Sequence, residues 1–147
     1  MKKGIALIAL FMTILLMLTA CSGDDGDGII EIPERFFVTQ TTEILGNPNR
    51  YLGRTIRLEG MFFTRIWPGT GEELHFVLRQ TPGCCSPADP IGFELRLENT
   101  DPLPDNTWVE VTGVLELYVD VWQQNMLRLE VISLTAMTER GAEFVTQ

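Results

Sequence analysis

Lysine is almost absent from this chain. Its only lysines are Lys2 and Lys3, and the other nine of its eleven basic residues are arginines. Residues 1–20 contain no acidic residue, so the net charge of −9 falls by two, to −11, in residues 21–147. A domain this acidic repels phosphate backbones, which excludes nucleic acid as an expected partner. The missing lysines also remove side-chain amines from the available nucleophiles.

Histidine and cysteine are nearly as scarce, which narrows the chemistry further. The chain has one histidine, His75, and three cysteines, Cys21, Cys84 and Cys85. Neither loop cysteine stands in a Gly-x-Cys-x-Gly elbow, and the loop aspartates stand beside prolines and asparagines, where they are typical turn formers. The sequence therefore predicts a protein that is not an enzyme.

Long apolar runs are also missing, apart from one at the start. Residues 4–18 are mostly apolar, about 15 residues against the ~20 that a membrane-spanning helix needs, and they follow two lysines as in a secretory signal. The run ends in "LTAC", which looks like the lipobox of bacterial lipoproteins, in which the cysteine is acylated and becomes the first residue. We therefore expect lipidation at Cys21, contact with membrane lipid through that anchor, and a location on the extracytoplasmic face of the cell membrane.

The chain divides into three parts on this interpretation. Residues 1–20 are a lipoprotein signal peptide, and residues 21–30, with "SGDDGDG", are an acidic Gly/Asp tether that cannot bury apolar area. Residues 31–147 are long enough for one compact domain and too short for two.

Alternation of apolar and polar residues with a period of two predicts five strands in that domain. One strand is expected to set Leu74, Phe76 and Leu78 on its apolar face, opposite His75, Val77 and Arg79. The pattern of the last strand slips after Val131, which indicates a bulge or a second buried face. The five segments are "RTIRLEGMFFTRI" (with Ile56, Leu58, Phe62 and Ile66 on one face), "LHFVLR", "IGFELRLE", "WVEVTGVLELYV" and "MLRLEVISL".

These strands favour a closed barrel. Gly60 and Gly113 lie inside strand patterns, where they permit sharp coiling, and a short helix is expected from about Thr42 to Leu45. A β-sandwich would need about seven strands. The predicted fold is all-β, a small five-stranded OB-fold-like barrel with one short helix, preceded by the signal and lipobox segment.

The adjacent cysteines lie in "TPGCCSPADPIG", a loop between the second and third predicted strands. Three interpretations stay open for Cys84 and Cys85. They could form a strained vicinal disulfide, which an extracytoplasmic location permits. They could bind zinc or copper with help from Asp89 and His75. They could also be small apolar residues that fill space in the loop.

Aromatic residues suggest where a ligand would bind. OB-type barrels use the face of their middle strands and the adjoining loops, and Trp67, Tyr118 and Trp122 are candidate stacking residues there. The alternative is that Trp67 and Trp122 close the ends of the barrel or touch lipid headgroups.

The chain resembles the carboxy-terminal domain of the YcgQ-like family of permease-associated proteins. The resemblance is carried over about 90 residues by Tyr51-Leu52-Gly53, Gly60, Cys84-Cys85, Asp89, Pro90-Ile91-Gly92 and Trp108-Val109. Asp89 departs from the family's spacing, because it stands four residues after Cys85 and directly before Pro90. The resemblance implies an extracytoplasmic accessory domain, associated with a membrane permease and connected with metal handling, without established catalysis.

The sequence therefore predicts a membrane-anchored lipoprotein that acts as a non-catalytic binding or accessory domain, with a membrane permease as a candidate partner. The alternative is a thiol-based carrier or sensor of zinc or copper that uses the Cys84-Cys85 loop.

Overall fold

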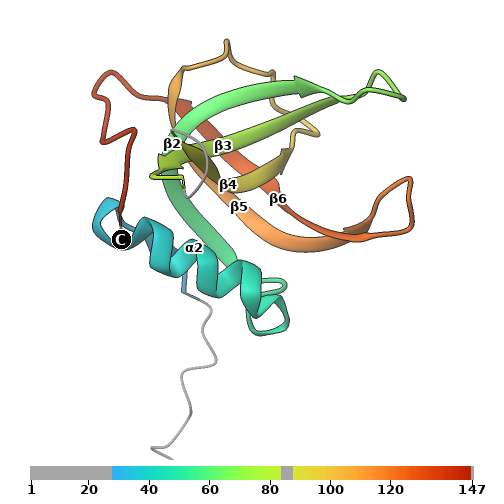
Figure 1. Ribbon diagram of the computed structural model, residues 1–147, viewed down its shortest axis with the longest axis horizontal. Coiled ribbons are helices and arrows are strands. Elements are labelled where there is room, and N and C mark those ends of the chain that lie inside the picture. Colours follow the sequence, from blue (N-terminus) through green and yellow to red (C-terminus); the bar gives the residue numbers. More distant parts are fainter. Residues whose placement is uncertain (1–27, 84–87, 147) are drawn as a thin grey trace, which may run out of the picture.

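The computed structural model describes residues 28–83 and 88–146, which form a closed five-stranded barrel with one α-helix across one end (Figure 1). Three short elements and the helix precede the barrel. They are β1 (Ile30–Ile32), the 3₁₀ turn η1 (Glu34–Phe36), α2 (Phe37–Gly46) and the 3₁₀ turn η2 (Pro48–Arg50). The barrel strands are β2 (Thr55–Ile66), β3 (Glu73–Thr81), β4 (Asp89–Arg96), β5 (Trp108–Val119) and β6 (Asn125–Ala136).

The strand order closes the sheet on itself. Neighbours around the barrel run β2-β3-β4-β6-β5, and β5 pairs again with β2. All these pairings are antiparallel except β4 with β6, which is parallel. Closure leaves the barrel strands without a long open edge. The prediction of an OB-like five-stranded barrel with one short helix is confirmed.

Close approaches between strands explain two of the glycines. A Cβ atom at Gly60 would lie 2.8 Å from the carbonyl oxygen of Leu78, and one at Gly113 would lie 2.8 Å from that of Glu130. Only glycine fits such contacts without a shift of the backbone. The register also changes at Gly113, because Thr112 pairs with Ser133 and Gly113 with Val131. Ile132 is the extra residue, so the predicted bulge after Val131 is confirmed.

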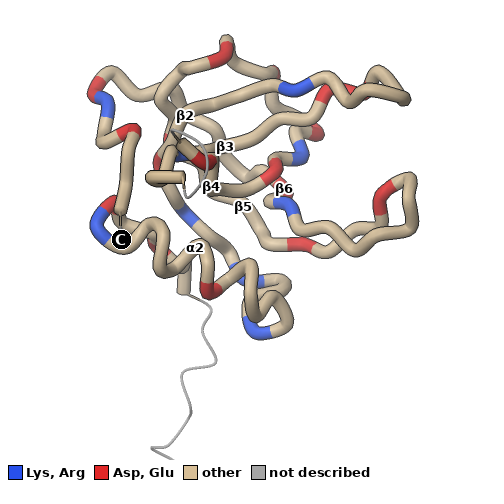
Figure 2. Tube along the Cα trace, in the orientation of Figure 1, with Lys and Arg blue, Asp and Glu red and all other residues tan. Residues whose placement is uncertain are grey.

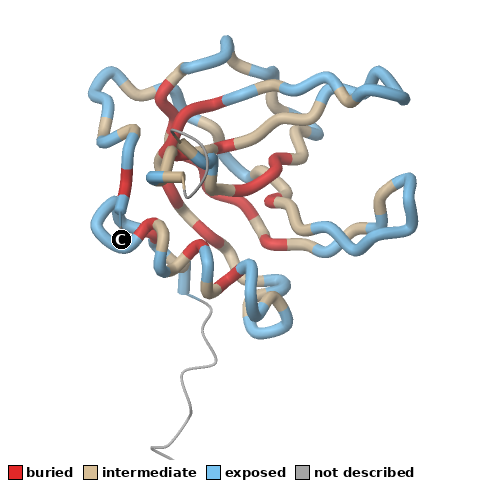
Figure 3. The backbone as a smooth tube through the Cα atoms, viewed as in Figure 1, coloured by how far each residue is buried: buried red, intermediate tan, exposed pale blue. Residues whose placement is uncertain are grey.

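The core lies inside the barrel and under α2. Figure 3 shows the buried stretches on the barrel strands and on the helix. Phe37 and Ile44 on α2 are almost fully buried against it. The helix is longer than the expected Thr42–Leu45, because Phe37, Thr41 and Ile44 recur at helical spacing and extend its buried face back to Phe37. The buried barrel residues include Ile56, Leu58, Phe62, Val77, Phe93, Leu95, Val109, Val111, Leu115 and Leu129.

The inward face of β3 is the reverse of the one expected. Val77 and Arg79 are buried, whereas Leu74 and Phe76 are only partly buried. Arg79 can lie inside because its guanidinium has partners there, among them the Glu34 carboxylate at 2.9 Å. Ile66, which was also expected on an apolar face, is exposed at the end of β2. The outward side of β3 then carries apolar side chains away from the core.

Candidate ligand pocket

Two hairpins, β2–β3 and β5–β6, extend from the same side of the barrel. Backbone hydrogen bonds fix the turn of the first one, between β2 and β3. The amide of Trp67 donates to the carbonyl oxygen of Glu72 at 2.7 Å, and the amide of Gly71 donates to that of Trp67 at 3.0 Å. Gly71 has a φ of +73°, a conformation that glycine adopts without strain. This turn holds Trp67 at the point where β2 ends.

Asp120 builds the second hairpin, between β5 and β6. Its Oδ1 atom accepts hydrogen bonds from the backbone amides of Trp122 at 2.9 Å and Gln124 at 2.8 Å. Aspartate commonly closes turns in this way, and here the closure presents Trp122 from the hairpin tip.

The two indoles bring the hairpins together. The ring centroids of Trp67 and Trp122 are 5.0 Å apart, and the ring planes are inclined by 57°. Tilted pairs at this distance are a favourable aromatic arrangement. Trp122 remains about half exposed, so the pair forms part of an open rim.

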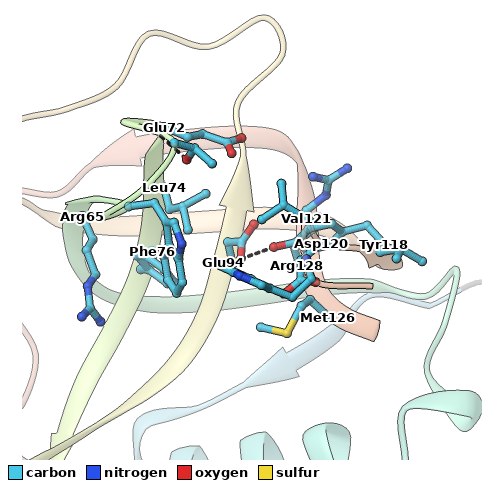
Figure 4. Close-up of a pocket in the computed structure, with 14 residues that line it drawn as sticks. Arg65, Glu72, Leu74, Phe76, Glu94, Tyr118, Asp120, Val121, Met126 and Arg128 are labelled. Atoms are coloured by element: carbon cyan, nitrogen blue, oxygen red, sulfur yellow. Dashed lines mark hydrogen bonds between the residues drawn. The ribbon is translucent and has the colours of Figure 1, made fainter. Parts of the chain in front are cut away.

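A pocket of about 430 Å³ lies between the hairpins, on the outer face of the barrel (Figure 4). This volume is within the usual range for small-molecule sites. Its apolar wall comes from both hairpins and from the outward side of β3, and its members besides the two tryptophans are Leu74, Phe76, Val119, Val121 and Met126.

A buried carboxylate lies in this largely apolar wall. Glu94, on β4, is only 9% exposed, and its Oε2 atom accepts a hydrogen bond of 2.7 Å from the Tyr118 hydroxyl. Loss of solvent on burial raises the pKa of Glu94, and this effect outweighs the lowering by the Tyr118 hydrogen bond and by the charge of Arg128. Burial and the neighbouring Glu94 carboxylate also raise the pKa of Tyr118, so that its hydroxyl remains a donor.

The two arginines of the pocket make their contacts with groups other than Glu94. The Nε atom of Arg128 donates to Glu116 at 2.5 Å, and its guanidinium lies 4.2 Å from the centre of the Tyr118 ring. The guanidinium of Arg65 lies 5.8 Å from the centre of the Trp67 ring. Basic and acidic positions are interspersed over the barrel (Figure 2), and within the pocket the arginines are engaged by other groups.

The structure brings the three aromatic residues singled out from the sequence into this one pocket. Trp67, Tyr118 and Trp122 all line it, from β2–β3 on one side and β5–β6 on the other. Whether they bind a ligand stays a prediction.

The structure does not bring together His75 and Asp89, two of the residues suggested for a metal site. His75 contacts the Thr64 hydroxyl through Nδ1 at 3.2 Å and stacks on Phe62, with ring centroids 5.6 Å apart. Six register positions separate His75 from Asp89 along β3 and β4, a distance of about 20 Å. The two side chains therefore do not share a site, and Cys84 and Cys85 lie outside the described residues, as does Cys21. In residues 28–83 and 88–146, no three His, Cys, Asp or Glu side chains are grouped in a way that could hold a metal ion.

Sequence reasoning missed the outward side of β3 and the buried Glu94. A signal was present in "LHFVL", where Leu74, Phe76 and Val77 place apolar residues on both faces of one strand. The outward face of such a strand has to pack against something other than the barrel core. Glu94 had no comparable signal, because a glutamate in an alternating strand ordinarily faces solvent.

Comparison with known proteins identifies a family. A family model described as the DUF1980 C-terminal domain matches residues 17–146. No curated protein matches the chain. Over the part of the chain that the structure describes, no helix has the length and apolar character required to cross a membrane.

Proposed function

The chain belongs to the DUF1980 C-terminal domain family, and from this premise we propose that it is a lipid-anchored, extracytoplasmic binding domain without catalytic activity. Its ligand is a small molecule that occupies the pocket between the two hairpins. The resemblance to permease-associated proteins favours a membrane permease as the partner that this domain serves.

The observation that carries the proposal is the pocket itself. Leu74 and Phe76 point out of the barrel into a space of about 430 Å³, where the core gives them no cover. Apolar pockets with a few convergent polar groups are the usual form of a small-molecule site. Here Glu94 and Tyr118 supply polar atoms, and the tryptophans of both hairpins form the rim.

Anchoring through Cys21 rests on the sequence. The "LTAC" motif follows an apolar run that is too short for a spanning helix. Two or more acyl chains would retain the domain at the bilayer, because each buried CH₂ contributes about 0.8 kcal/mol. The acidic tether would then separate the barrel from the membrane surface.

An uncharged solvatochromic dye, Prodan, tests the pocket. We expect one dye molecule to bind per full-length protein with blue-shifted emission. Leu74→Arg places a long charged side chain in the pocket, on the outward side of β3, and should weaken dye binding by about tenfold or more. Thermal unfolding of the variant establishes that the barrel is still folded.

Ile132→Arg is the matched control. Ile132 is an exposed residue at the β6 bulge, outside the pocket lining, so the same type of substitution should leave dye binding unchanged. If Prodan fails to bind, or if both variants weaken it equally, the hairpin pocket is not the binding site.

A further inference from the structure

Glu94 lacks a counter-charge in direct contact, as far as the described residues show. Its hydrogen-bond partner there is the neutral hydroxyl of Tyr118, which donates to Oε2 at 2.7 Å. A buried carboxylate normally has a cationic partner or is neutralised. The pocket therefore contains an acceptor whose charge is not balanced by the groups that touch it.

Arg128, the cross-strand neighbour of Glu94 on β6, attracts the carboxylate electrostatically but forms neither a hydrogen bond nor an ion pair with it. Its Nε atom is bound to Glu116, and its guanidinium lies against the Tyr118 ring. The other groups that face the same space are Glu72 and Arg65 at the β2–β3 hairpin and Asp120 at the β5–β6 hairpin. Asp120 is tied to its own turn, Arg65 lies by Trp67 and Arg128 is paired with Glu116, so the polar part of the pocket around Glu94 has an excess of acidic groups.

Aromatic rings surround this acidic part. Phe76 lies directly across from Glu94 in the β3–β4 register, and Tyr118 contacts Glu94 from β5. Trp67 and Trp122 add two indoles at the rim. The faces of aromatic rings attract cations and take up apolar groups, whereas they offer nothing specific to an anion.

We infer that the ligand of this pocket is an organic amine, with a protonated nitrogen bound to the Glu94 carboxylate and an apolar or aromatic body packed between the hairpins. This inference rests on the proposed function, because it names the chemical class of the ligand for the same pocket. An anion would meet Glu94 and Glu72, and a neutral molecule would leave the Glu94 carboxylate without a cation in contact.

Three probes of nearly equal shape separate these classes. They are 2-phenylethylamine, 2-phenylethanol and phenylacetate, which carry a positive charge, no charge and a negative charge. Binding to the purified full-length protein is followed by calorimetry and by the fluorescence of the rim tryptophans. The amine should bind about tenfold more tightly than the alcohol, as expected for a charge-assisted hydrogen bond, and phenylacetate should bind most weakly.

Glu94→Gln should remove the preference for the amine while the alcohol still binds, because the amide keeps the shape and an acceptor for Tyr118. Glu73→Gln is the matched control, since it removes one negative charge at the start of β3 from a residue outside the pocket lining. With the native chain, affinity for the amine should rise with pH as Glu94 ionises, and this dependence should be absent in Glu94→Gln.

Equal affinities for the amine and the alcohol, or a preference that survives Glu94→Gln, would overturn the amine assignment. If Leu74→Arg still abolishes Prodan binding in that case, the pocket remains the ligand site and only the amine assignment is rejected. Failure of all three phenyl probes alongside successful Prodan binding also rejects the amine assignment, and failure of Prodan rejects the proposed function.

Discussion

Arg79 and Glu34 form an ion pair across 45 residues of sequence, with Nη1 of Arg79 2.9 Å from Oε2 of Glu34. The arginine is almost completely buried and the glutamate is half exposed. Arg79 also donates to the carbonyl oxygens of Glu59 and Ala142, at 2.9 and 2.8 Å, and its guanidinium lies between the rings of Phe37 and Trp108. A single side chain thus joins the turn before α2, the barrel and the segment after β6.

Arg79→Met should therefore destabilise the fold strongly. The substitution removes the Arg79 donor from two carbonyl oxygens and one of the two donors from the Glu34 carboxylate, which we expect to cost about 3 kcal/mol in the free energy of unfolding. Urea denaturation measures the loss. Arg57→Met is the control, because Arg57 pairs with Glu31 where both are exposed, and it should cost less than about 1 kcal/mol. Similar losses in the two variants would contradict this prediction.

Glu34 should make stability depend on pH in the acid range. The hydrogen bond from Arg79, and next that from the Ala142 amide, lower the pKa of Glu34 from its ordinary value of 4.5. A pKa that is lower in the folded state gives stabilisation that is present above pH 4.5 and is lost as the pH falls through the folded-state pKa. Glu34→Gln should lack this component in unfolding curves measured at a series of pH values. An unchanged pH profile would show that Glu34 is not linked to folding.

Glu94 should act in the opposite direction. Burial raises its pKa above 4.5 in the folded state, so folding becomes less favourable as the pH rises through that raised pKa. Glu94→Gln removes the penalty, and we expect a higher unfolding midpoint at neutral pH than for the native chain, with the advantage disappearing in acid. Lower stability of Glu94→Gln at neutral pH would mean that the carboxylate is better compensated than its contacts indicate.

The glycine in the middle of β4 offers a test of strand packing. A Cβ atom at Gly92 would lie 1.9 Å from the carbonyl oxygen of Val77, a distance that only movement of the backbone can relieve. Gly92→Ala should cost about 3 kcal/mol or more, or should prevent folding. Gly46→Ala is the matched control, since nothing lies within 4 Å of its added atom, and circular dichroism during heating should show it unchanged or more stable.

Lipid attachment can be tested at Cys21. Cys21→Ser should abolish covalent acylation, which mass spectrometry of the amino-terminal peptide of the native protein would detect. Cys84→Ser is the control and should remain acylated. A native protein without acyl chains would reject the anchoring proposal.

Much of the barrel could be predicted because its strands follow simple alternation. The segment "WVEVTGVLELYV" coincides with β5, and the slip after Val131 marks the bulge at Ile132. By contrast, β1 has only three residues and escaped prediction, since pairing with β2 rather than its own pattern defines it.

The inward face of β3 could not be predicted from local pattern. Burial of Arg79 depends on Glu34 and Ala142, which are distant in sequence and become partners only in the folded chain. Apolar Leu74 and Phe76 consequently face the pocket. For the candidate site, the aromatic residues could be chosen by residue type. The burial of Glu94 could not be predicted, because it depends on the hairpins that fold around it.

The Arg79–Glu34 contact also determines how the molecule would carry a mechanical load. A pull on the chain ahead of Ile30 reaches the barrel first through the pairing of β1 with β2 and then through Glu34. In Figure 1 this route enters beside α2, whereas the hairpins project from a different side. Tension on the leading segment would therefore enter the barrel near the helix, on a different side from the hairpins.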